Sequence, residues 1–317
     1  MKKNISLTAF SLMTAMTLTA CSSKFSFEGE MGALSANINN HGLPASVNNG
    51  FIYYQGTDGF YEYDPEDKTS ARVSEANLGF NAVKAGFIVE DERKVQYLNH
   101  KGEILSRQSF PECDKFSSIF AYDDRIYCGD YVLDTKSGKT ARLFEEEDTT
   151  SGFYYALSDE YYFKVNIDEK CLEKISVKDK NAEVQTMELP QEIKWVSEFA
   201  VDLNSDIYIS SFDENNDLTL YKITSDSDKA AAVDLAAPTV HYAVLNNNIA
   251  YLDHYIEKES NDLYYNNTLV AKDVFRFTLL DEKYLIYTAM NEDYSEKVYL
   301  YDIENGEIEQ LKTVTEE

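Results

Sequence analysis

Near its C-terminus the chain carries the stretch KVYLYDIENGEIEQL at residues 297–311, a tyrosine-rich alternating run and a shorter one joined by a turn of Asp, Asn and Gly. Alternation of bulky and polar residues over four to eight positions predicts a β-strand. An Asn-Gly turn between two such runs predicts a hairpin. The stretch therefore predicts two antiparallel strands.

The same pattern recurs upstream. Seven runs that follow a polar turn lie at residues 49–54, 86–89, 124–128, 160–163, 206–209, 248–251 and 283–287. A third run follows in several units, as at 60–63, 218–221 and 298–301, and a fourth run lies beyond another turn, as at 308–311. A period of about 40 residues with four strands per unit is typical of propeller blades. We therefore predict an all-β fold, a β-propeller of seven four-stranded blades over residues 43–317.

The two ends of this region predict how the ring closes. Residues 43–47 supply the first strand of the first unit, and the last unit contains its own fourth strand up to Leu311. We therefore expect the first and last blades to pack against each other without a strand borrowed across the seam.

The N-terminus has the features of a signal peptide. MKKNISLTAFSLMTAMTLTAC combines Lys2 and Lys3, an apolar stretch diluted by Ser and Thr at 5–17, and small residues before Cys21. This stretch is too short and too polar for a stable membrane-spanning helix, which needs about 20 apolar residues. We predict a signal peptide at 1–20, cleaved before Cys21, and a tether at 21–42.

The tetrad Leu18-Thr19-Ala20-Cys21 resembles the lipobox of bacterial lipoproteins, in which the cysteine thiol receives a diacylglyceryl group and becomes the new N-terminus. The resemblance implies that Cys21 is lipidated, with palmitate-type acyl chains, and that the membrane is a partner through this anchor. It implies a place in the cell envelope, on the outer side of the cytoplasmic membrane. The Lys-, Asn- and Tyr-rich, Arg-poor composition favours a Gram-positive host. The alternative is an ordinary secretory signal with a coincidental cysteine.

The repeat region resembles, in its strand pattern over residues 43–317, bacterial propeller lipoproteins that are distantly similar to the YWTD propellers of lipoprotein-receptor ectodomains. The chain lacks the YWTD tetrad itself, the Trp-Asp blade ending, the kelch double glycine and the sialidase-type Asp box. The subfamily therefore stays open.

The charge excludes one class of partner. The chain has 56 acidic and 29 basic residues, a formal charge of −27. Such a surface repels phosphate polyanions, so we expect no binding of nucleic acid. The simplest reading of the acidity is solubility, and the alternative is binding of a cation or a basic partner.

Residues with catalytic or metal-binding chemistry are sparse. The four histidines, His41, His100, His241 and His254, show no zinc-ligand spacing, and no GxSxG motif is present. Carboxylate pairs are abundant, but the sequence cannot select two that face one cleft. We therefore predict no catalytic residue and no resident cofactor.

Three cysteines remain after lipidation of Cys21, namely Cys113, Cys128 and Cys171. Cys128 follows Ile126 at the spacing of a buried strand position, so a small apolar side chain is the simplest reading. A Cys113–Cys128 disulfide is the alternative, although the two would not lie opposite each other in a hairpin that turns at 123–124. Their disulfide state stays open.

Acidic loops predict a common surface. The connections at 90–93, 145–148 and 213–217 are expected at one mouth of the ring and carry many carboxylates. The densest oxygen cluster lies at Asp213, Asn215 and Asp217, which form a weak candidate calcium site without the EF-hand spacing. The alternative reading is a set of solvated surface loops.

Two functions fit these features. The first is a noncatalytic, lipid-anchored binding or scaffold module for an envelope protein or glycan. The alternative is an envelope enzyme that acts on glycan or peptide at the acidic mouth of the channel. Paired acids that converge on the mouth would favour the enzyme, and a flat, aromatic-rimmed or closed mouth would favour the binding module.

Overall fold

The computed structural model describes residues 43–75, 80–83, 86–91, 93–99, 101–113, 119–145, 153–166, 170–225, 227, 229–254, 261–290 and 296–314. The predicted signal peptide, Cys21 and the tether lie outside these residues, as do His41 and His100. All regular secondary structure in the described residues is β-strand. Among them there is no helix with the length and apolar character needed to cross a bilayer.

Five sheets have four antiparallel strands each, paired in chain order. The first comprises β1 (Ala45–Asn48), β2 (Phe51–Gln55), β3 (Phe60–Asp64) and β4 (Thr69–Ser74). The second comprises β5 (Phe80–Val83), β6 (Gly86–Asp91), β7 (Lys94–Leu98) and β8 (Ile104–Ser109). The third comprises β9 (Ile119–Tyr122), β10 (Arg125–Cys128), β11 (Tyr131–Asp134) and β12 (Lys139–Arg142).

The fourth sheet comprises β13 (Phe153–Leu157), β14 (Tyr161–Asn166), β15 (Cys171–Ser176) and β16 (Gln185–Glu188). The fifth comprises β17 (Trp195–Val201), β18 (Ile207–Phe212), β19 (Leu218–Ile223) and β20 (Ala230–Ala232). The remaining strands, β21 (His241–Leu245), β22 (Asn248–Leu252), β23 (Asn261–Tyr265), β24 (Thr268–Leu279), β25 (Tyr284–Met290), β26 (Glu296–Asp302) and β27 (Glu307–Gln310), form one continuous seven-stranded sheet.

This last sheet corrects the prediction of seven separate four-stranded blades, because only five such sheets form in the described residues. The physical reason lies in β24, whose first half pairs with β23 and whose second half pairs with β25. Asp273 takes a left-handed φ of 58°, and the register shifts between Val274 and Arg276, so the strand bends without a break in its pairing.

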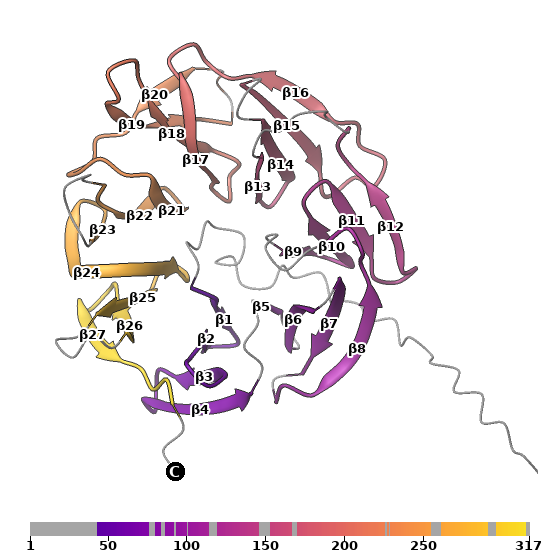
Figure 1. Ribbon diagram of the computed structural model, residues 1–317, viewed down its shortest axis with the longest axis vertical. Helices are drawn as coiled ribbons and strands as arrows, with labels where there is room; N and C mark the ends of the chain where they lie inside the picture. Colours follow the sequence, from indigo (N-terminus) through magenta and orange to yellow (C-terminus); the bar gives the residue numbers. More distant parts are fainter. Residues whose placement is uncertain are drawn as a thin grey trace, which may run out of the picture.

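The sheets are arranged as a β-propeller (Figure 1). The first strand of each sheet lies toward the centre of the ring, and the last strand lies at the rim. Each sheet packs against one neighbouring sheet on each of its two faces, so its inner strands are buried on both sides. Five of the six residues of β18 are buried, whereas all four residues of the rim strand β12 are exposed.

The ring closes as the sequence predicts, by packing of its two end sheets. Leu43, Ile52 and Tyr54 share a hydrophobic cluster with Leu280 and Ile286. The Thr278 hydroxyl donates to the Leu43 carbonyl at 2.7 Å, and the Tyr54 hydroxyl donates to the Lys312 carbonyl at 2.6 Å. None of the described strands β1–β4 pairs with a strand of the last sheet.

The open question about the cysteines is answered by a Cys113–Cys128 disulfide. Cys113 lies after β8, on the connection between the second and third sheets, so the register of the β9–β10 hairpin does not restrict it. Both cysteines are fully buried in a cluster with Ile88 and Leu133. Cys171 is not part of this bridge and is partly exposed.

Candidate functional site

The ring has two faces, which differ in the connections they carry. We name the face with the connections between second and third strands the BC face, and the opposite one the AB face. First strands begin, and second strands end, on the BC face. Trp195, the first residue of β17, accordingly pairs with Phe212, the last residue of β18.

Exposed apolar side chains gather on the BC face of the last two sheets. Trp195 is 53% exposed, and Phe275 and Met290 are each 40% exposed. They lie at the BC-face ends of β17, of the second half of β24 and of β25. Ile104, Leu105, Leu269 and Ile308, by contrast, are exposed on strands or strand segments at the rim. Trp195 thus lies on the first strand of its sheet, and Phe275 and Met290 lie on the second half of β24 and on β25, not at the rim.

A bulge in β17 sets the direction of Trp195. The register shifts between Val196 and Glu198, and the Tyr154 hydroxyl donates to the Ser197 carbonyl at 2.5 Å. In a regular strand, residues three apart point to opposite faces. Because one extra residue is inserted, Trp195 and Glu198 share the side that faces the next sheet.

A second bulge lies at the equivalent end of β24. Its register shift between Val274 and Arg276 leaves Phe275 as the extra residue. Val274 and Phe277 both point into the hydrophobic cluster of the seven-stranded sheet, while Phe275 stays exposed. Bulges of this kind re-aim side chains and are over-represented next to binding sites.

Polar side chains lie beside these apolar ones. His241, the first residue of β21, places Nδ1 3.7 Å from Oε2 of Glu198, and its side chain is 48% exposed. Arg276 donates through Nε and Nη2 to Oε1 of Glu296, at 3.1 and 2.5 Å. Burial opposes ionisation of Glu296, but its hydrogen bonds and Arg276 outweigh it, so the pKa lies below its usual value.

We name this surface the BC patch. Its apolar members are Trp195, Phe275 and Met290, and its polar members are Glu198, His241, Arg276 and Glu296. The sequence predicted no metal-ligand role for His241 and did not point to the apolar residues. A signal was present, because the single tryptophan of the chain stands at the start of a first strand.

The predicted calcium residues lie in the turn between β18 and β19. Asp213 Oδ1 accepts hydrogen bonds from the backbone amides of Asn215 at 2.8 Å and Asp217 at 2.9 Å. These backbone hydrogen bonds hold the pKa of Asp213 below its usual value. One carboxylate oxygen thus closes the turn. Calcium binding there stays a prediction, and no cluster of three or more His, Cys, Asp or Glu that could hold a metal occurs in the described residues.

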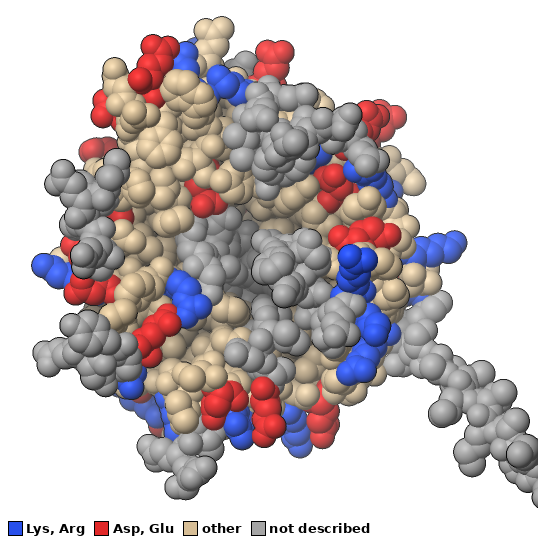
Figure 2. All heavy atoms as spheres, viewed as in Figure 1, with Lys and Arg blue, Asp and Glu red and all other residues tan. Residues whose placement is uncertain are grey.

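The predicted acidic mouth rests largely on residues outside the described ranges, namely most of 145–148 and the side chains of 90–92. On the face shown in Figure 2, the described Asp and Glu side chains are mostly spread around the outer part of the ring, interspersed with Lys and Arg. Nearer the centre, most described atoms belong to neither class.

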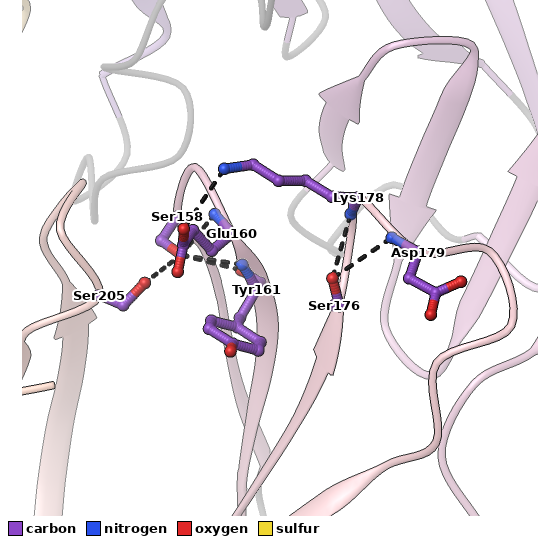
Figure 3. Close-up of polar contacts among 7 residues, drawn as sticks. All are labelled: Ser158, Glu160, Tyr161, Ser176, Lys178, Asp179 and Ser205. Atoms are coloured by element: carbon purple, nitrogen blue, oxygen red, sulfur yellow. Dashed lines mark hydrogen bonds and ion pairs between the residues drawn. The ribbon is translucent and has the colours of Figure 1, made fainter. Parts of the chain in front are cut away.

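A serine pair on the AB face illustrates how hydroxyl groups are used in this fold (Figure 3). Ser158 Oγ lies 2.8 Å from Ser205 Oγ and accepts from the amides of Glu160 and Tyr161 at 3.2 and 3.0 Å. These contacts close the β13–β14 turn and join it to the next sheet. Because the partners are backbone groups and a second hydroxyl, they supply no general base for a nucleophile.

No protein-family model matches the chain, and neither does any curated protein. Solved structures that resemble it include the tricorn protease, with a TM-score of 0.54, and a puromycin-hydrolysing peptidase from Mycobacterium tuberculosis, with a TM-score of 0.56. Each is 12% identical, and the similarity covers 90% and 91% of this chain but only 35% and 56% of those chains. At this identity the similarity shows the β-propeller fold alone.

Proposed function

We propose that this protein is a noncatalytic binding module, held in the cell envelope by a lipid anchor, whose ligand contacts the BC patch. The supporting observation is the exposure of Trp195, Phe275 and Met290 on inner strands, where neighbouring large side chains are buried. Phe275 and Met290 lie on the paired strands β24 and β25, and Trp195 lies on β17 of the preceding sheet. Exposed apolar residues rimmed by polar groups mark interaction sites in soluble domains. Aromatic residues and methionine are also enriched in such interfaces.

The polar members suit recognition. The Arg276–Glu296 pair and the His241–Glu198 pair place donors and acceptors beside the apolar side chains. An apolar surface with a few fixed polar groups gives both affinity and orientation. The Ser158 hydroxyl and the Asp213 carboxylate, by contrast, accept hydrogen bonds from backbone amides and close turns.

A binding screen can use Trp195 as its own reporter, because it is the single tryptophan. Neutral oligosaccharides and peptides would be titrated while the emission maximum is followed. We expect a ligand to shift the emission to shorter wavelength as it removes water from the indole. The Phe275→Ala/Met290→Ala variant should bind more weakly, and the matched rim variant Ile104→Ala/Ile308→Ala should bind as the wild type does. Ligand binding that is indifferent to both variants contradicts the proposal.

A second candidate is an envelope enzyme that acts on peptide. It is supported by the two peptidases among the similar structures, although this chain corresponds to only part of each. The test is release of new amino groups from a peptide mixture by the purified protein. Turnover that persists through repurification would replace the binding function by this one.

We also propose that the ring contains seven blades, two of which share β24. In the described residues, seven hydrophobic clusters follow one another around the ring, one within the seven-stranded sheet and one at the seam between the last and first sheets. An experimental density map with six radial units would contradict this.

The lipid anchor rests on residues 18–21 of the sequence. Wild-type protein should incorporate radiolabelled palmitate and partition into detergent. Cys21→Ser protein should do neither. A Cys21→Ser protein that still fractionates wholly with membranes argues against lipidation.

A further inference from the structure

The chemistry of the ligand follows from the charges around Trp195. Glu198, 15% exposed beside His241, shares its side of β17. The β18–β19 turn, next to Phe212, the pairing partner of Trp195, carries the exposed residues Glu214 and Asp217, and these three carboxylates outnumber the partly exposed basic neighbour Lys194. Exposed carboxylates beside an exposed indole favour a cation, because the indole face and the carboxylates both attract positive charge. The formal charge of −27 adds long-range attraction for a cationic ligand and repulsion for an anionic one.

The size of the ligand follows from the spacing of the apolar residues. Trp195 belongs to β17 and Phe275 to β24, and β21 lies between them in the order of first strands (Figure 1). Sheets that pack face to face lie about 10 Å apart, so two steps cover about 20 Å. An extended polypeptide covers about 3.3 Å per residue, so about six residues reach from one aromatic side chain to the other.

We propose that the BC patch binds an extended, cationic polypeptide segment that carries apolar side chains between lysine or arginine residues. Its apolar side chains pack on Phe275 and Met290, and its cationic groups lie against Trp195, Glu198 and the β18–β19 turn. This rests on the proposed binding function and names its ligand class. Charge complementarity distinguishes this ligand from a neutral glycan, which gains nothing from the carboxylates.

The test uses a capped octapeptide of alternating lysine and leucine. Two matched peptides, glutamate with leucine and lysine with serine, separate the charge from the apolar contribution. Trp195 emission is followed at constant ionic strength and again at raised salt. We expect the lysine–leucine peptide to shift the emission and the other two to bind at least about tenfold more weakly, because both contributions are needed. Raised salt should weaken the binding.

Variants then locate the site. Phe275→Ala/Met290→Ala should lower the affinity at least about tenfold, since apolar anchors dominate such contacts. Glu198→Gln/Glu214→Gln should lower it by roughly threefold or more. Glu66→Gln/Glu304→Gln removes the same charge from exposed turns on the AB face and should leave the affinity within about twofold.

The possible results distinguish a specific peptide site from attraction by overall charge and from a glycan site. Equal losses in the BC-face and AB-face charge variants would mean attraction by overall acidity, and would overturn the inference. A neutral hexasaccharide that shifts Trp195 emission when the peptide does not would overturn the inference but leave the binding function standing. No shift with any peptide or sugar would count against both.

Discussion

Lys164 provides a sharp test of how neighbouring sheets are joined. Its side chain is fully buried, with Nζ 3.4 Å from Asp130 Oδ1, 3.6 Å from Glu173 Oε2 and 5.6 Å from the centre of the Phe144 ring. Asp130 belongs to the third sheet's β10–β11 turn, whereas Lys164 and Glu173 pair across β14 and β15. The Lys164 ammonium thus pairs with carboxylates from two neighbouring sheets.

The Lys164→Met variant keeps most of the volume and removes the charge. Removal of one member of a buried ion pair costs about 3–5 kcal/mol, because the partner charge stays buried. Asp130 keeps Arg142 at 3.4 Å and the Tyr155 hydroxyl at 2.9 Å, so its charge stays partly compensated. We therefore expect a loss of about 3 kcal/mol, at the lower end, and a fall in Tm of roughly 6–10 °C for a domain of this size.

The assay is thermal unfolding followed by circular dichroism, with two companion variants. Lys164→Met/Glu173→Leu removes both charges and should recover at least half of the loss, since apolar pairs replace buried ion pairs at little cost. Lys178→Met breaks the pair with Glu160, where both side chains are more than half exposed, and should change Tm by no more than about 1–2 °C. A Lys164→Met protein as stable as the wild type would refute the reasoning.

Three further predictions concern other parts of the ring. Tyr242→Phe removes a buried hydroxyl that accepts from the Ser210 amide at 3.1 Å, so we expect a loss of about 2 kcal/mol in urea unfolding, against little change for partly exposed Tyr221→Phe. Burial opposes ionisation of Asp206, but Lys222 at 2.7 Å and further hydrogen bonds outweigh it and hold its pKa below the usual value. A carboxylate with a lowered pKa stabilises the fold above its unfolded pKa of about 3.9, and this stabilisation is lost as pH falls through the folded pKa. Asp206→Asn should therefore be less stable than the wild type at pH 7 and as stable near pH 2. An equal difference in stability at both pH values would argue against this. Reduction of the Cys113–Cys128 bridge should cost about 3 kcal/mol, for a sequence separation of 15, in unfolding with and without reductant, and an unchanged midpoint would contradict a formed bridge.

Strand positions were the most predictable feature. The predicted run at 206–209 lies within β18 apart from its first residue, and the run at 248–251 falls within β22. Side-chain alternation and polar turns are local properties, so they can be recognised directly in the sequence. The continuity of β24 was not predictable, because it depends on the backbone of Asp273 and on pairing with two partner strands.

The candidate surface was less predictable than the fold. Trp195 resembles a core residue by type, and its exposure follows from the bulge near Ser197, which tertiary contacts stabilise. Asp213 is a residue type that binds metals, but the same short side chain also closes turns by accepting from backbone amides further along the chain. Sequence composition alone cannot separate these two uses.

The binding role of the BC patch can be tested most directly in intact cells of the native host. A photoreactive amino acid would be placed at Met290, in the patch, or at Ile308, an exposed position on the rim strand β27. After irradiation, we expect a discrete crosslinked product from position 290, abolished by Trp195→Ala in the same chain, and none from position 308. Equal crosslinking from both positions, or a product from 290 that survives Trp195→Ala, would contradict it.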